Sequence, residues 1–87
     1  MELKIKEERG LEEEIEKRRK NIDNYDNQIA KLLEKRFEEV EKISELKERG
    51  GFRIYEPQRQ ARILKRLHKI VNLPEEAINS IWDAIFK

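Results

Sequence analysis

Two cations lie on a helical face that is otherwise apolar. Between Leu11 and Lys47 apolar residues recur at steps of three and four. The stripe consists of Leu11, Ile15, Ile22, Tyr25, Ile29, Leu33, Val40 and Ile43. Arg36 and Lys47 fall on its centre line, within about 20° of each other at 100° per residue. Because buried unpaired charge is costly, these cations either pair internally or bind an anionic ligand.

Two further arginines can join this pair. Arg36 and Lys47 are about 16 Å apart along a helix axis, so their long side chains can reach one small anion between them. Arg19 lies about 25 Å further back and can reach that anion only from an antiparallel partner chain. Arg59 follows a loop and can approach from the end near Lys47. Such a pocket suits a small dicarboxylate or a phosphate.

The chemistry of this pocket is electrostatic. The surrounding sequence supplies no obvious nucleophile or acid–base pair, so a reaction here would depend on conformational clamping and fixed charge. The sequence contains no cysteine and one histidine, His68. A thiolate nucleophile is therefore excluded, and neither a cysteine-based nor a histidine-based metal site is expected. We expect no cofactor.

The elements that must position these cations are all helical. Residues 11–49 contain neither proline nor glycine, which predicts a helix of about 40 residues, or roughly 55–60 Å. Gly50 and Gly51 form its C-terminal stop. Pro57 opens a second helix running to about Val71, after an extended connection from Phe52 to Glu56, and Pro74 precedes a third. The predicted fold is all-α, with one very long helix and two shorter ones.

The chain is predicted to hold a single domain over residues 11–87, preceded by a leader or frayed N-terminus over residues 1–10. The second helix is expected to bury Ala61, Leu64, Leu67 and Val71, and the third Ile78, Ile81, Trp82 and Ile85. Two short helices cannot cover the stripe of so long a helix, and an exposed apolar stripe usually marks an interface. We therefore predict an antiparallel homodimer.

Composition limits the remaining function classes. Hydrophobic residues make up 37% and charged residues 45% of the chain, which is lean for a self-sufficient monomer core. Lys plus Arg number 20 and Asp plus Glu 19, giving a net charge of +1 that argues against nucleic-acid binding. No apolar run is long enough to cross a membrane, and no secretory segment is present. The predicted location is the cytoplasm.

At this point the residues indicate a family. The segment IDNYDNQIAKLLEKR, residues 22–36, closely resembles the first-helix signature of the all-helical chorismate mutases. In that family an Arg lies seven residues before the second Asp, as Arg19 does, and a Lys lies eleven after the conserved Arg, as Lys47 does. A glycine-containing loop then leads to an acidic-Pro-x-Arg-Glu segment, matched by residues 56–60. The resemblance covers about 11–67 and continues more loosely into the last helix.

The resemblance implies a function. Those enzymes convert chorismate to prephenate by an intramolecular Claisen rearrangement in aromatic amino-acid biosynthesis, as intertwined homodimers with shared sites and no cofactor. Arg36 and the partner chain's Arg19 would bind the substrate carboxylates, and Lys47 would donate to the ether oxygen. Arg59 would support the carboxylate-binding end. Glu56 would contact the ring hydroxyl region through its backbone or side chain.

Two positions depart from the family pattern. Where the family has Glu after the second-helix Arg, this chain has Gln60, a weaker acceptor for a hydroxyl. Family members usually carry a Gln or Glu near the end of a longer third helix, donating a second hydrogen bond to the ether oxygen. No residue up to Lys87 can be aligned with it. Removing one such donor costs about 10²–10³ in rate, by analogy with an oxyanion hole.

Other interpretations of the same residues stay open. Arg36 and Lys47 can reach water or pair with Glu39, Glu48 or Asp26. Two other functions compete with the mutase: an isochorismate-pyruvate lyase, or a catalytically weak helical dimer that binds a small dicarboxylate or a protein partner. The following side chains are given structural or solvated roles: Lys17, Arg18, Asp23, Asp26, Tyr55, His68, Trp82 and Phe86.

Overall fold

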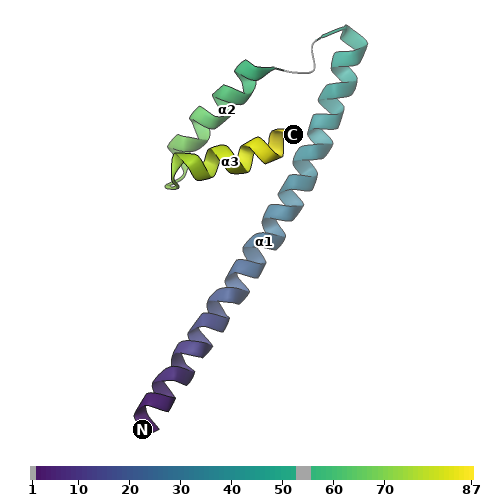
Figure 1. Ribbon diagram of the computed structural model, residues 1–87. Coiled ribbons are helices and arrows are strands. Elements are labelled where there is room, and N and C mark those ends of the chain that lie inside the picture. The colour runs from purple at the N-terminus through teal and green to yellow at the C-terminus, as the bar shows by residue number, and fades with distance from the viewer. Residues whose placement is uncertain (1, 53–55) are drawn as a thin grey trace. The chain divides into compact units, whose positions relative to one another are not determined.

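The computed structural model describes residues 2–52 and 56–87, with side chains described from residue 6 onward. Within these residues the chain forms three helices, α1 (Glu2–Gly50), α2 (Pro57–Ile70) and α3 (Glu75–Phe86) (Figure 1). The all-α prediction of one very long helix and two short ones is thereby confirmed. Most of the predicted extended connection and Tyr55 lie outside the described residues. No helix in the described part of the chain is long and apolar enough to span a membrane.

The start of α1 differs from the sequence expectation. The helix begins at Glu2 rather than near Leu11, so residues 2–10 belong to it. The physical reason is that Gly10 alone interrupts a run of good helix formers, and one interior glycine costs only about 1 kcal/mol. Whether residues 1–10 stand outside the functional domain remains a prediction.

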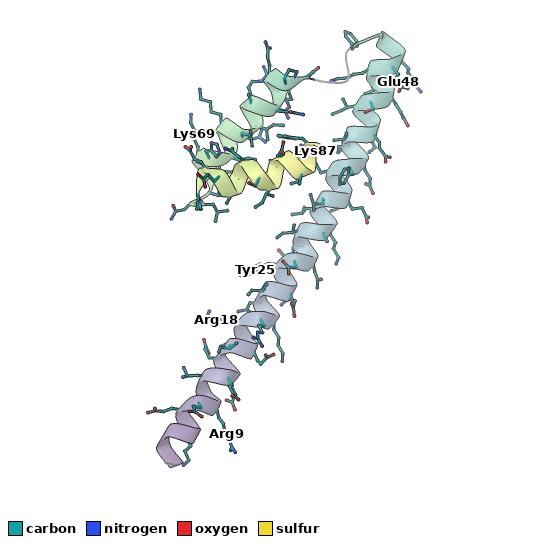
Figure 2. The ribbon with its side chains drawn as sticks, in the orientation of Figure 1. Arg9, Arg18, Tyr25, Glu48, Lys69 and Lys87 are labelled. Carbon is teal, nitrogen blue, oxygen red and sulfur yellow. The ribbon has the colours of Figure 1, made fainter. Side chains whose placement is uncertain are left out.

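The chain divides into two compact units, residues 1–46 and residues 47–87. The described part of the first unit is the main length of α1, whose surface charges pair locally. Arg18 bonds Glu14 at 2.9 Å and Arg19 bonds Glu16 at 2.7 Å, one helical turn apart. Figure 2 shows side chains standing out all along this helix, with Arg18 and Tyr25 labelled.

The apolar stripe of α1 is left exposed by a single chain. Seven of its eight members are exposed, from 42% for Val40 to 64% for Leu11, and Leu33 is half-buried. Leu32, Phe37 and Leu46 are also exposed, at 62%, 51% and 62%. So much apolar surface on one helix is typical of an interaction face.

The second unit contains α2, α3 and the last turn of α1. Its core consists of Ile63 and Leu67 from α2 and Ile78 from α3, with Leu64, Trp82 and Phe86 packed against it. Beside this core, Nε2 of the half-buried His68 lies 3.0 Å from Oδ1 of Asn79, a hydrogen bond between α2 and α3. The structural roles predicted for His68, Trp82 and Phe86 are confirmed.

The face that α2 turns toward α3 is rotated from the predicted one. Ile63 is buried although it was not predicted, whereas Ala61 is exposed and Val71 is 38% exposed. Val71 has an extended backbone, at φ −128° and ψ 151°, because it caps the helix and no longer follows its face. On α3, Ile78 is 2% exposed but Ile81 is 48% exposed, so the contact lies on the Ile78–Trp82 side.

Candidate active site

The ammonium of Lys47 is held by a carboxylate from the start of the next helix. Nζ of Lys47 donates to Oε1 of Glu56 at 2.8 Å, and only 18% of the lysine side chain is exposed. Lys47 belongs to the last turn of α1, and Glu56 caps the N-terminus of α2. The sequence left open a pairing of Lys47 with Glu48; the structure instead pairs it with Glu56.

Backbone geometry at the end of α1 places this lysine. The amide of Phe52 donates to the carbonyl of Lys47 at 2.9 Å, and the amide of Gly51 donates to the carbonyl of Glu48 at 3.4 Å. These two bonds form a Schellman motif, which requires a left-handed residue after the helix. Gly51 fills that position with φ +69°. The glycine stop predicted from the sequence is confirmed, and it fixes the backbone from which Lys47 extends.

The start of α2 places two more of the predicted residues. The carbonyl of Glu56 accepts hydrogen bonds from the amides of Arg59, at 3.1 Å, and Gln60, at 3.3 Å. Pro57 occupies the first turn, where its missing N–H costs nothing. Lys47, Glu56, Arg59 and Gln60 therefore belong to one compact unit.

The charges in this unit act on Glu56. The hydrogen bond from Lys47 and then its positive charge hold the pKa of Glu56 below its ordinary value of 4.5, while desolvation works in the opposite direction. Arg62 and Arg59 lower this pKa further through their charges. The carboxylate is thus ionised at neutral pH and keeps its partner.

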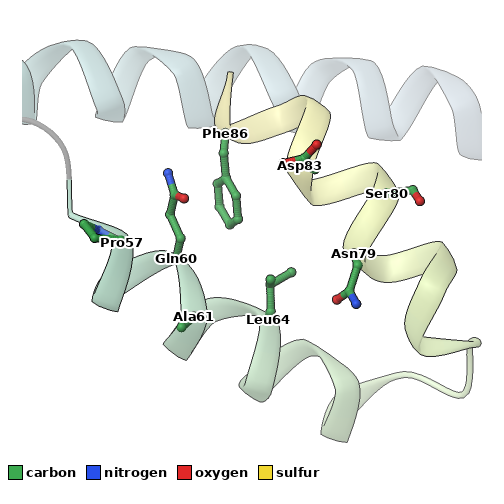
Figure 3. Close-up of a pocket in the computed structure, with 8 residues that line it drawn as sticks. All are labelled: Pro57, Gln60, Ala61, Leu64, Asn79, Ser80, Asp83 and Phe86. Atoms are coloured by element: carbon green, nitrogen blue, oxygen red, sulfur yellow. The ribbon is translucent and has the colours of Figure 1, made fainter.

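Gln60 lines an open groove of about 470 Å³ between α2 and α3. Apolar and polar side chains both line the groove. Its lining residues are Pro57, Gln60, Ala61, Leu64, Asn79, Ser80, Asp83 and Phe86. Figure 3 shows the Gln60 amide and the Phe86 ring extending into the same space from the two helices. Gln60 is the predicted site residue that reaches this groove.

Arg19 and Arg36 lie in the other compact unit, on the main length of α1. Arg19 is exposed and bonds Glu16 of its own helix, while Arg36 is half-buried. Glu39, one of the partners considered for Arg36, pairs with Lys42 at 3.5 Å. The structure therefore joins Lys47 to Glu56 and α2, and the meeting of Arg19, Arg36 and Lys47 at one anion remains a prediction.

Sequence reasoning named Glu56 but missed its partner. An acidic residue immediately before a helix-opening proline is favoured there by the helix dipole, and this signal points to the backbone rather than to a lysine. Among the described residues, no group of three or more His, Cys, Asp or Glu side chains is arranged to hold a metal ion.

Comparison with known proteins identifies the family. A family model described as "Chorismate mutase type II" matches residues 18–87. The chain belongs to the chorismate mutase type II family. The matched range includes Arg19, Arg36, Lys47, Glu56, Arg59 and Gln60. The family named from the first-helix signature is therefore confirmed.

A curated relative agrees with this family. Over 79 residues the chain is 34% identical to a protein of Aquifex aeolicus (strain VF5) named bifunctional chorismate mutase/prephenate dehydratase. The alignment covers 84% of this chain and 22% of the relative, so the chain spans about a fifth of that protein. No solved structure matches the chain. Chorismate mutase family membership thus rests on both the family match and this relative.

Proposed function

We propose that this chain is a chorismate mutase, an isomerase that rearranges chorismate to prephenate without a cofactor. The observation that carries the proposal is the family match over residues 18–87, which includes all four of the spaced cations. The reaction is intramolecular: the ether C–O bond breaks while a C–C bond forms, and no atom enters or leaves. The protein therefore has to fold the enolpyruvyl arm over the ring and stabilise the charge that develops on the ether oxygen.

The residues divide this work between them. Arg36 and the Arg19 of a second chain bind the two carboxylates, because a guanidinium can grip a carboxylate with two parallel hydrogen bonds. Lys47 donates to the ether oxygen, where negative charge grows in the transition state. Arg59 supports the carboxylate-binding end, and Gln60 and the backbone of Glu56 serve the ring hydroxyl. The small exposed fraction of Lys47, at 18%, supports its role, since a fixed charge acts more strongly where water is excluded.

The proposal includes an intertwined antiparallel homodimer. Its support is the exposed stripe of α1, together with a core that contains just three buried residues in the described part of one chain. An antiparallel copy would cover the stripe and bring its Arg19 toward Arg36 and Lys47.

The same proposal places the protein in the cytoplasm, with the cysteine-free sequence as its support. Neither the fold nor the comparisons favour the lyase or a non-catalytic dimer.

The direct test is chorismate consumption by the purified protein, with the products separated to distinguish prephenate from pyruvate. We expect prephenate alone. Arg36→Ala and Lys47→Ala should each reduce kcat/KM by about 10²-fold or more, by the loss of one fixed charge at the reacting centre. Far-UV circular dichroism and gel filtration should show the same helical assembly as wild type. No chorismate loss above background with folded wild-type protein would refute the proposal.

A further inference from the structure

The ion pair between Lys47 and Glu56 differs in kind from the others in the described part of the chain. The other four join residues three or four apart on one helix, and each of their side chains is at least 51% exposed. Pairs of that kind contribute little to stability. Lys47 and Glu56 instead join the end of α1 to the start of α2, and the lysine side chain is 18% exposed. This pair therefore holds the Lys47 ammonium beside the start of α2.

The carboxylate of Glu56 is not used by the helix that it begins. The side chain of Asp, Asn, Ser or Thr at an N-cap position ordinarily accepts an amide hydrogen from the first turn, but Glu is not one of these preferred residues. Glu56 makes no such side-chain bond, and its backbone carbonyl alone accepts from Arg59 and Gln60. Oε1 of Glu56 accepts from Lys47 instead. The side chain of Glu56 therefore serves the contact with Lys47 and not the end of the helix.

Lys47 needs such a partner if it is to act on a substrate. The Schellman motif fixes its backbone, but holding the long, flexible lysine side chain in one position itself costs conformational entropy. A charged group that must meet a developing charge is most effective when it is already in position. The ammonium has three N–H donors, so one can stay on Glu56 while another is offered to the substrate.

We propose that Glu56 is a positioning residue that holds the Lys47 ammonium ready for the ether oxygen, an inference that rests on the proposed function. Its carboxylate also opposes the approach of a substrate carboxylate to Lys47, because two like charges around one ammonium repel each other. This leaves carboxylate binding to the arginines and reserves Lys47 for the ether oxygen. Glu56 thus acts through Lys47, and its side chain does not touch the substrate.

The test compares Glu56→Gln with Glu39→Gln in the full chain. Glu39 is the matched control because its variant makes the same chemical change at an exposed carboxylate–lysine pair, with side chains 69% and 67% exposed. With chorismate as substrate, Glu56→Gln should lower kcat by about 10–100-fold, the range for a misplaced reacting group, with KM changed less than about threefold. Glu39→Gln should match wild type. Glu56→Asp, which keeps the charge, should recover part of the lost kcat.

A second measurement does not depend on turnover. In protein labelled with ¹⁵N-lysine, the ammonium signal of Lys47 should be visible in wild type and Glu39→Gln, because a paired and shielded ammonium exchanges slowly with water. The signal should be absent in Glu56→Gln. Circular dichroism and thermal unfolding show whether each variant is folded.

The possible outcomes separate the inference from the proposed function. Wild-type protein that does not convert chorismate overturns both. Conversion by wild type with equal kcat in Glu56→Gln and Glu39→Gln overturns the positioning role alone. A rise in KM at unchanged kcat in Glu56→Gln would show that the Glu56 side chain contacts the substrate and would also overturn the positioning role. A loss of kcat in Glu56→Gln that accompanies a loss of helix content would likewise overturn the positioning role.

Discussion

The carbonyl oxygen of Lys47 accepts a hydrogen bond from the amide of Phe52 at 2.9 Å, so the residue that contributes the ammonium of the candidate site also closes the longest described helix. Only a chain that turns into the left-handed region at Gly51 can make this bond. The position of Lys47 therefore depends on a glycine four residues away that has no side chain to offer the site.

Gly51→Ala should consequently weaken both the helix end and the site. A side chain at φ +69° is strained, which costs about 1–2 kcal/mol. We expect the free energy of unfolding to fall by about that amount and kcat to fall as Lys47 shifts. Urea unfolding and chorismate kinetics measure the two effects.

Gly10→Ala is the matched control for that substitution. Gly10 lies inside α1, and apart from its chain neighbours and the nearby backbone of that helix a methyl group there would meet no atom within 4 Å. Alanine is the better helix former, so stability should rise by about 0.5–1 kcal/mol with unchanged kcat. Equal effects of the two substitutions would contradict the role assigned to the turn.

The three helices could be predicted from the sequence because the residues that start and end a helix are local signals. Pro57 and Pro74 mark the starts of α2 and α3, and Gly50 and Gly51 mark the end of α1. The N-terminal start of α1 was missed because Gly10 is a weak breaker, and a long run of helix formers overrides it. The core face of α2 was predicted in part, since Leu64 and Leu67 do lie in or against the core. Ile63 was missed because Ala61 and Ile63 both fit a helical period, and only packing against α3 decides between them.

Ile78 should be the most sensitive apolar position of the second unit. It is 2% exposed and packs against Ile63 and Leu67. Ile78→Ala would leave a cavity, and we expect it to lower the free energy of unfolding by about 2–4 kcal/mol. Ile70→Ala is the control, since Ile70 is 66% exposed and its truncation should cost far less. Chemical denaturation of both variants makes the comparison, and similar losses would contradict a core centred on Ile78.

The Glu56–Lys47 pair should give stability a specific pH dependence. The pKa of Glu56 is lowered in the folded protein, chiefly by the hydrogen bond from Lys47 and its charge, with smaller contributions from Arg62 and Arg59. A carboxylate with a lowered folded pKa stabilises fully above its unfolded pKa, and this contribution is lost as pH falls through the folded value. Wild type should therefore be more stable than Glu56→Gln at neutral pH.

That difference should shrink as pH falls below about 4.5, the ordinary value for this carboxyl. Urea unfolding of both proteins between roughly pH 7 and pH 3 measures it. Glu39→Gln should stay close to wild type over the whole range. A gap between wild type and Glu56→Gln that widens toward acid pH would contradict the assigned pair.

The site could be predicted in part. The spacing of Arg19, Arg36 and Lys47 follows from helical geometry, which a sequence pattern records directly. The contact of Lys47 with Glu56 could not be predicted, because it depends on how the chain turns between α1 and α2 rather than on any period. The signal that was available, an acid before Pro57, is accounted for by the helix dipole and names no lysine partner.

Arg19 should act across a dimer, because within one chain it lies about 25 Å from Arg36 along the axis of α1. Arg19→Ala and Arg36→Ala should each be nearly inactive as pure proteins. In an equal mixture that exchanges subunits, half of the dimers are mixed, and one of the two sites in each contains both arginines. About a quarter of wild-type activity should return, as two-fold symmetry with shared sites requires. Chorismate consumption after denaturation and refolding of the mixture measures this, and a mixture no more active than its components would exclude a site shared between chains.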